Sequence, residues 1–177
     1  MKILLTGENG FLGSCVKKNI SSKFLYKKKG RYLINLTSPK KIKNFLQKNK
    51  PDVIINCAVK ADFKTEYSKN MYLVNYYSVK IFTDYCKRFN KKIIQISGTL
   101  VHPKKKIYSF KTLTKPTNYY AKTKLLADKY IIKQNPNYSI IRFGGIYGKR
   151  GPEHLFLNKI LNSKKKNHIF SGDIEMK

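Results

Sequence analysis

The chain has 177 residues, 41% of them hydrophobic, and its 38 basic residues outnumber 9 acidic ones to give a formal charge of +29. These values suit one folded domain with a sizeable core and argue against global disorder. No run approaches 18 apolar residues, and the N-terminus lacks a cleavage site for a signal peptide, so we expect neither a membrane span nor a secretory leader. Three scattered cysteines and three histidines have no spacing typical of metal ligands, which favours a cytoplasmic protein without a metal site.

The positive charge is carried almost entirely by lysine, which accounts for 34 of the 38 basic residues. Proteins that recognise nucleic-acid sequences favour arginine, because its planar group makes bidentate contacts. Here the lysines are spread along the whole chain, which favours a composition bias that fills solvated faces over a specific nucleic-acid interface. A general attraction for polyanions stays open as the alternative.

Short apolar runs alternate with helical patterns throughout the chain. In chain order we expect a strand over 2–5, a helix over 11–20, weak extended pieces over 24–26 and 32–35, a helix over 40–48, a strand over 51–56, a helix over 69–89, a strand over 92–97, a helix over 117–133, a strand over 138–142 and a helix over 153–162. Ser38 is expected to cap the second helix, with Pro39 at its first position. This alternation predicts an α/β fold: a Rossmann-like, doubly wound parallel sheet with helices on both faces.

Three glycines, Gly7, Gly10 and Gly13, follow the first expected strand and open the first expected helix. In that setting the first glycine permits a tight turn, the second lets the backbone approach a pyrophosphate, and the third lets the helix pack on the strand. The spacing G-x-x-G-x-x-G differs from the simplest dinucleotide fingerprint, G-x-G-x-x-G.

Several further stretches, in order along the chain, accompany this motif: PDVIINCAV, YLVNYYSVK, IIQISGTLVH, PTNYYAKTKLLADKY and SIIRFGGIYGKRGP. Together with the glycine spacing they resemble the extended short-chain dehydrogenase/reductase superfamily, the NAD-dependent epimerases, dehydratases and 4-keto reductases of nucleotide sugars. The closest resemblance is to enzymes of the dTDP-4-dehydrorhamnose reductase type. The resemblance implies a dinucleotide-binding domain over 1–163 and the start of a truncated substrate-binding region over 164–177.

Tyr120 and Lys124 match the Tyr-x-x-x-Lys pair of that superfamily and lie on one face of the expected helix. A neighbouring ammonium favours a phenolate, so we expect Lys124 to lower the pKa of Tyr120 and make it a general acid or base. The hydroxyl that polarises the substrate oxygen is harder to assign, because the commonest family position falls on Gly98. Ser97 is the first choice for this role and Thr99 the second.

The resemblance also assigns a set of residues to the dinucleotide. They are Gly7, Glu8, Asn9, Gly10, Phe11, Leu12, Gly13, Lys27, Asn35, Leu36, Cys57, Ala58, Val59, Asn75, Tyr120 and Lys124. Between Glu8 and Asp52 there is no acidic residue to bind a ribose 2′-hydroxyl, while 27–31 is rich in basic residues. This favours NADP, with NAD as the alternative.

The function that these resemblances imply is an NAD(P)-dependent reduction, epimerisation or dehydration of a nucleotide-diphosphate sugar, as used in building cell-surface polysaccharides. They imply no partner in nucleic acid or membrane, and a homodimer as a candidate assembly. A non-catalytic dinucleotide-binding regulatory subunit, or a degenerate truncated relative, stays open as the alternative, because of Gly98 and the short C-terminal part.

Overall fold

The computed structural model describes residues 1–26, 33–62, 66–103, 113–148 and 151. The chain divides into two units, Met1–Gly144 and Gly145–Lys177. All helices and strands found in the described residues belong to the first unit. The helix expected over 153–162 lies outside the described residues.

A sheet of four parallel strands forms the centre of the first unit, in the order β1 (Ile3–Thr6), β2 (Val53–Asn56), β3 (Lys92–Gly98), β4 (Asn137–Phe143). The register pairs Ile3 with Val53 at one end and Gly98 with Phe143 at the other. Because all strands run the same way, their carboxyl ends meet at one edge, where ligands of such sheets bind.

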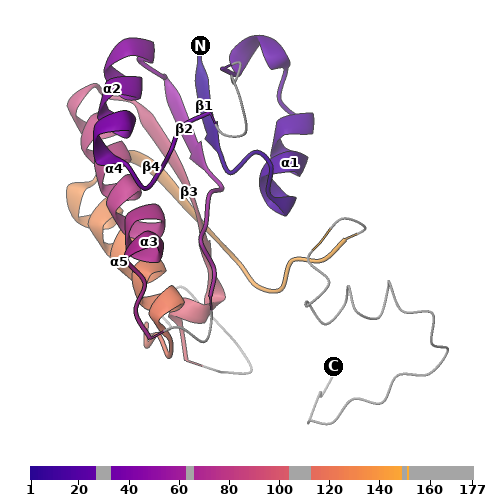
Figure 1. Ribbon diagram of the computed structural model, residues 1–177, viewed down its shortest axis with the longest axis vertical. Helices are drawn as coiled ribbons and strands as arrows, with labels where there is room; N and C mark the ends of the chain where they lie inside the picture. The colour runs from indigo at the N-terminus through magenta and orange to yellow at the C-terminus, as the bar shows by residue number, and fades with distance from the viewer. Residues whose placement is uncertain (27–32, 63–65, 104–112, 149–150, 152–177) are drawn as a thin grey trace, which may run out of the picture. The chain divides into compact units, whose positions relative to one another are not determined.

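Helices cover both faces of this sheet (Figure 1). On one face lies α1 (Phe11–Lys18), and on the other lie α2 (Pro39–Asn49), α4 (Ser78–Arg88) and α5 (Tyr119–Gln134). The buried core is packed between the sheet and the second group of helices and includes Leu4, Ile54, Phe82 and Ile131. The predicted fold class is therefore confirmed. None of the helices in the described ranges has the length and apolar character needed to cross a bilayer.

Helix ends follow the expected capping chemistry. Ser38 accepts a hydrogen bond from the Lys41 amide at 3.4 Å, and Pro39 is the first residue of α2. The last long helix begins two residues later than predicted, since the Asn118 side chain caps it through the Ala121 amide at 2.8 Å.

Three expected elements differ in the structure. The stretch 24–26 contributes a 3₁₀ turn (Ser22–Phe24) and a single parallel bridge from Leu25 to Ile3, not a full strand. Within 33–35 the backbone forms no strand. The helix expected over 69–89 is divided into α3 (Lys69–Tyr72), a π turn (Leu73–Tyr77) and α4.

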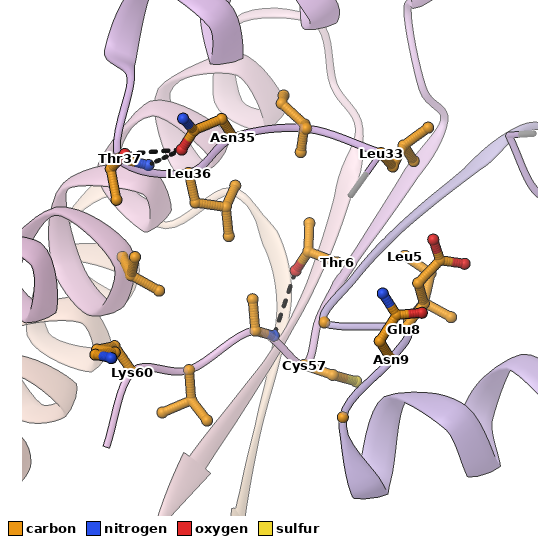
Figure 2. A pocket seen from close by; sticks show the side chains of 16 residues that line it. Leu5, Thr6, Glu8, Asn9, Leu33, Asn35, Leu36, Thr37, Cys57 and Lys60 are labelled. Carbon is orange, nitrogen blue, oxygen red and sulfur yellow. Dashed lines mark hydrogen bonds between the residues drawn. The ribbon is translucent and has the colours of Figure 1, made fainter. Parts of the chain in front are cut away.

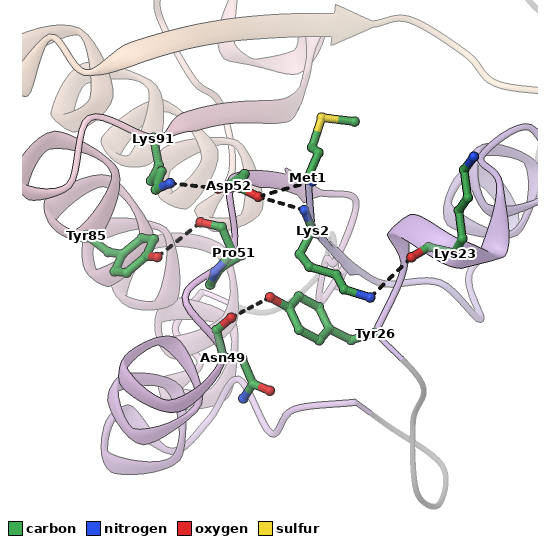
Figure 3. A network of polar contacts seen from close by, with 9 residues as sticks. All are labelled: Met1, Lys2, Lys23, Tyr26, Asn49, Pro51, Asp52, Tyr85 and Lys91. Carbon is green, nitrogen blue, oxygen red and sulfur yellow. Dashed lines mark hydrogen bonds and ion pairs between the residues drawn. The ribbon is translucent and has the colours of Figure 1, made fainter.

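At the amino ends of the strands, Asp52 ties three of them together (Figure 3). Its carboxylate accepts the Lys2 amide and the Lys91 ammonium, each at 2.7 Å. The Lys91 hydrogen bond, followed by that of Lys2, lowers the pKa of this carboxyl. Nearby, the Tyr85 hydroxyl donates to the Pro51 carbonyl at 3.0 Å. Polar bonds thus fix the edge opposite the carboxyl ends of the sheet.

Candidate functional site

A cavity of about 510 Å³ opens at the carboxyl ends of β1 and β2 (Figure 2). Three chain segments line it: the glycine loop after β1, the residues after β2, and the stretch 33–37. Val74 of the π turn closes the remaining side. Its place, between the first strand and the strand beside it, is where open parallel sheets bind ligands.

The glycine loop approaches the neighbouring backbone closely. Gly7 has φ of +71°, and a Cβ there would lie 2.5 Å from the Ala58 nitrogen. At Gly13 a Cβ would lie 2.0 Å from the Gly7 carbonyl oxygen. Both distances are far below van der Waals contact, so only glycine fits these positions. The glycines therefore allow the loop after β1, the loop after β2 and the start of α1 to pack closely at the cavity.

The N-terminus of α1 follows this loop directly and has no N-cap side chain to accept hydrogen bonds from its first amides. Gly10 is the N-cap, its backbone is extended, and its side chain offers no acceptor. The first turn of the helix carries no acidic residue. A helix end with unoccupied amides and positive dipole suits an anionic group such as a diphosphate. The cradle therefore fits the phosphates of a dinucleotide.

The loop after β2 is held from both sides. The Asn56 amide donates to Gln95 at 2.8 Å and accepts a bond from the Thr6 hydroxyl, while the Ala58 amide donates to the Thr6 hydroxyl at 3.4 Å. Further along, the Asn75 side chain accepts a hydrogen bond from the Lys60 amide and donates one to the Lys60 carbonyl, each at 2.9 Å.

Asn75 is fully buried and reaches a third element as well. Its amide nitrogen also donates to the Thr123 hydroxyl on α5 at 3.0 Å. It does not line the cavity, but it fixes the loop that does. The π turn of Leu73–Tyr77, which contains it, is a local distortion of the kind often found at functional sites.

The stretch 33–37 closes the cavity above β1. The Asn35 side chain accepts hydrogen bonds from the amide and the hydroxyl of Thr37, at 2.9 and 2.7 Å, and so forms a local turn. Figure 2 shows this pair at the rim. No acidic side chain is found in this stretch.

Lys124 lies behind the loop at Cys57. It is 3% exposed, its ammonium donates to the Ile96 carbonyl, and it interacts electrostatically with Cys57. Burial lowers the pKa of Lys124 to about 8, although Asp128 and Cys57 oppose this shift. Burial also raises the pKa of Cys57 to about 11, so this side chain is a thiol at neutral pH.

The expected effect of Lys124 on Tyr120 is corrected by the structure. Burial raises the pKa of Tyr120, where the sequence predicted a lowered value. The reason is desolvation of the phenolate by burial, while the Lys124 ammonium donates to the Ile96 backbone carbonyl. In this state the phenol keeps its proton at neutral pH.

Ser97 belongs to a buried polar network. Its hydroxyl donates to the Asp128 carboxylate at 2.9 Å, and Arg142 binds the same carboxylate oxygen through two nitrogens at 3.1 and 3.0 Å. Asp128 is fully buried, and burial raises its pKa. The other end of Arg142 reaches His102 at 3.5 Å. This network joins β3, β4 and α5 beneath Lys124.

Thr99 begins a 3₁₀ turn (Thr99–Val101) directly after β3 ends at Gly98. The turn therefore places Thr99 outside the strand that carries Ser97. Ser97 lies on the buried face, while Thr99 is partly exposed at the carboxyl edge.

The structure brings most of the residues assigned to the dinucleotide to this cavity. Those that line it are Gly7, Glu8, Asn9, Gly10, Asn35, Leu36, Cys57, Ala58 and Val59. The remaining residues of the glycine segment, Phe11, Leu12 and Gly13, form the first turn of α1. Tyr120 and Lys124 are on α5, outside the lining. Lys27 lies outside the described residues.

Seven lining residues were not predicted from the sequence: Leu5, Thr6, Leu33, Ile34, Thr37, Lys60 and Val74. Leu5 and Thr6 end the strand directly before the glycines, and this position could have identified them as lining residues. Lys60 and Val74 reach the cavity only through the Asn75 clamp and the π turn, which no local pattern predicts. Asp128 and Arg142 were visible as motif members, but their pairing was not.

The fold and this edge cavity define a Rossmann-type α/β protein with a glycine-rich loop. Over residues 1–171 the chain matches the model of the RmlD substrate binding domain family, and it belongs to that family. The resemblance to the extended short-chain dehydrogenase/reductase superfamily is thereby confirmed. Comparison with curated protein sequences gives no match.

Three solved structures illustrate the similarity. A hypothetical dTDP-4-dehydrorhamnose reductase from Sulfolobus tokodaii is 30% identical, with a TM-score of 0.74 over 85% of this chain and 58% of its own. The Clostridium acetobutylicum dTDP-4-dehydrorhamnose reductase is 29% identical, with a TM-score of 0.77 over 92% of this chain and 59% of its own. The Yersinia enterocolitica enzyme is 27% identical, with a TM-score of 0.78 over 90% and 58%. The chain thus spans less than two thirds of the length of these structures.

Gly13→Ala tests the close approach at the cavity floor. A Cβ would lie 2.0 Å from the Gly7 oxygen, so α1 must shift, and we expect unfolding to become easier by about 1–3 kcal/mol. Urea denaturation measures this difference. Gly145→Ala is the control, because a Cβ there meets no atom within 4 Å. Equal stabilities of the two variants would contradict the packing argument.

Lys124→Met tests the burial of the ammonium. The pKa of about 8 in the folded chain lies below the unfolded value of about 10.4, so the unfolded chain binds more protons between these pH values. The stability of the wild type therefore rises with pH across that window. Below the window, the buried ammonium is charged and its burial lowers the free energy of unfolding by the full amount. Between pH 7 and 9.5 we expect wild type to gain about 2 kcal/mol relative to Lys124→Met.

Urea denaturation at both pH values measures this gain. Lys122→Met is the control, because it removes an exposed lysine from the same helix and should leave the pH dependence of wild type unchanged. A gain that is the same in both variants would show that Lys124 is not the group responsible.

Proposed function

We propose that this chain is the dinucleotide-binding part of an NAD(P)-dependent enzyme that modifies a nucleotide-diphosphate sugar, most closely a reductase of a 4-keto sugar. The observation that carries the proposal is the cavity at the carboxyl edge, which the glycine loop lines and whose lining residue Cys57 interacts with a buried lysine on α5. Membership of the RmlD substrate binding domain family and the named activity of the similar structures support the same function.

The lining suggests how a dinucleotide would be held. Its diphosphate would lie over the glycine loop and the uncapped amides of α1, and its adenosine against the stretch 33–37. The nicotinamide end would then lie toward Cys57 and Lys124, where a thiol and small side chains leave room for a ring. Both NAD and NADP fit this description.

When bound, the dinucleotide supplies or accepts the hydride. Tyr120 would hold the proton: its phenol stays protonated, which suits donation to a substrate oxygen during reduction of a ketone. In that step the carbonyl carbon gains the hydride and its oxygen gains the phenolic proton. Lys124, with a pKa close to the working pH, would compensate the phenolate that is left.

Thr99 takes over from Ser97 as the first choice for the hydroxyl that polarises the substrate oxygen. The Ser97 hydroxyl is already donated to the buried Asp128 carboxylate, and releasing it would leave that carboxylate short of a donor. Thr99 follows the same strand end and is partly exposed at the edge that carries the cavity.

Recognition of the sugar would require residues beyond the dinucleotide domain, which we place at 1–163, with the substrate-binding region starting at 164. A cytoplasmic setting agrees with the three free thiols at Cys15, Cys57 and Cys86. A homodimer stays a prediction.

Ligand titration tests the proposal. Thermal shift and calorimetry with NAD⁺, NADP⁺, a dTDP-sugar and a UDP-sugar should show stabilisation by at least one dinucleotide. Dinucleotide binding together with turnover of a dTDP-4-keto sugar, in a protein that joins this chain to a substrate-binding part, supports the enzyme. Binding without turnover supports the alternative, a non-catalytic dinucleotide-binding subunit, which Gly98 at the polarising position favours. No shift with either dinucleotide would contradict both.

Three variants of that protein test the assigned roles. Tyr120→Phe should remove turnover and keep dinucleotide affinity within about twofold, because only the proton donor is lost. Thr99→Val should lower kcat by about 10- to 100-fold, since a hydrogen bond to the reacting oxygen is removed. Ser97→Ala is the matched control. It should lower the free energy of unfolding, because the bond to Asp128 is lost, and it should lower kcat less than Thr99→Val does. A larger loss of kcat in Ser97→Ala than in Thr99→Val would assign the polarising hydroxyl to Ser97.

A further inference from the structure

One carboxylate, Glu8, lines the cavity among the described residues, and it comes from the glycine loop itself. Its side chain is 11% exposed, and one of its oxygens lies 2.8 Å from the Lys17 ammonium. In Figure 2 Glu8 extends on the side of Leu33, and Lys60 lies on the opposite side. A nearly buried carboxylate is unexpected beside a loop suited to phosphates, because the two negative charges repel each other.

The two nicotinamide dinucleotides differ at one position, the 2′-oxygen of the adenosine ribose. A carboxylate accepts a hydrogen bond from a 2′-hydroxyl and repels a 2′-phosphate. Rossmann-type proteins usually place that acid after the second strand. Here the lining stretch 33–37 offers Asn35 and Thr37, which bond to each other, and no acid. Glu8 lines the same cavity at the Leu33 end of this stretch (Figure 2).

An ion pair with Lys17 stabilises Glu8 in this nearly buried position. The Lys17 side chain is 44% exposed and comes from the last turn of α1, while Glu8 precedes the first turn. The ion pair therefore links the loop before α1 to the last turn of that helix and fixes the position of the carboxylate. It also offsets the desolvation of a carboxylate that has left bulk water.

We propose that Glu8, held by Lys17, selects the dinucleotide that lacks a 2′-phosphate, so that this chain binds NAD in preference to NADP. The inference rests on the proposed function and deepens it. It runs against the formal charge of +29, which would attract the more anionic dinucleotide, and against the preference predicted from the basic residues of 27–31, which lie outside the described residues. A contact inside the cavity acts at short range, whereas salt screens the effect of a net charge over distance.

Calorimetry on the purified chain tests this selection with two ligand pairs. The pairs are NAD⁺ with NADP⁺, and 5′-AMP with adenosine 2′,5′-bisphosphate; the second pair isolates the adenosine end. Wild type should bind the member without the 2′-phosphate at least about tenfold more tightly. Glu8→Gln should bring each pair within about threefold, mainly through tighter binding of the phosphorylated member.

Two further variants make the test specific. Lys17→Met removes the ammonium that lies 2.8 Å from the Glu8 carboxylate, so it should widen the discrimination, opposite in sign to Glu8→Gln. Glu66→Gln, the same substitution at an exposed residue outside the cavity, should keep the wild-type ratio. Wild type that prefers NADP⁺, or a ratio unchanged in Glu8→Gln while both dinucleotides still bind, overturns the role of Glu8 and leaves the proposed function standing. Absence of binding by every adenine nucleotide overturns both.

Discussion

The close approach of two backbone segments at Gly7 is the constraint on which the site depends. The Gly7 α-carbon faces the peptide of Cys57 and Ala58 so closely that a Cβ would lie 2.5 Å from the Ala58 nitrogen, and Gly13 packs against the Gly7 carbonyl in turn. These contacts bring the start of α1 onto the carboxyl ends of β1 and β2. Any side chain at either position would separate the helix amides from the loop and open the cradle.

The second requirement is a buried lysine beside that cradle. The Lys124 ammonium donates to the Ile96 carbonyl and interacts electrostatically with Asp128 and Cys57, and its burial lowers its pKa to about 8. Such a shift costs folding free energy at neutral pH, because the charged form is disfavoured in the interior. The Asp128–Arg142 ion pair and the Ser97 hydroxyl beneath it limit that cost, since they hold a carboxylate near the ammonium.

The sequence predicted the sheet, the crossover helices and the glycine cradle, because each depends on local periodicity or on spacing within one turn. It did not predict the contacts that join distant segments. Asn75 clamps Lys60 and Thr123, and Ser97 donates to Asp128 across 31 positions, so neither partner is visible in a local pattern. The pKa of Tyr120 was predicted in the wrong direction for a related reason: spacing reveals a neighbouring charge, but not how much water folding removes.

Charge in this protein acts differently at long and short range. Most lysines in the described part of the chain are exposed, and salt screens such charges beyond about 10 Å. Inside the first unit two acids are buried or nearly so, Glu8 in the cavity and Asp128 beneath α5, and each faces a basic partner that is itself partly exposed. The exposed partner keeps contact with water while the acid supplies a fixed charge to the interior. In the selection that we propose for Glu8, ligand choice follows from such a local pair and not from the net charge of +29.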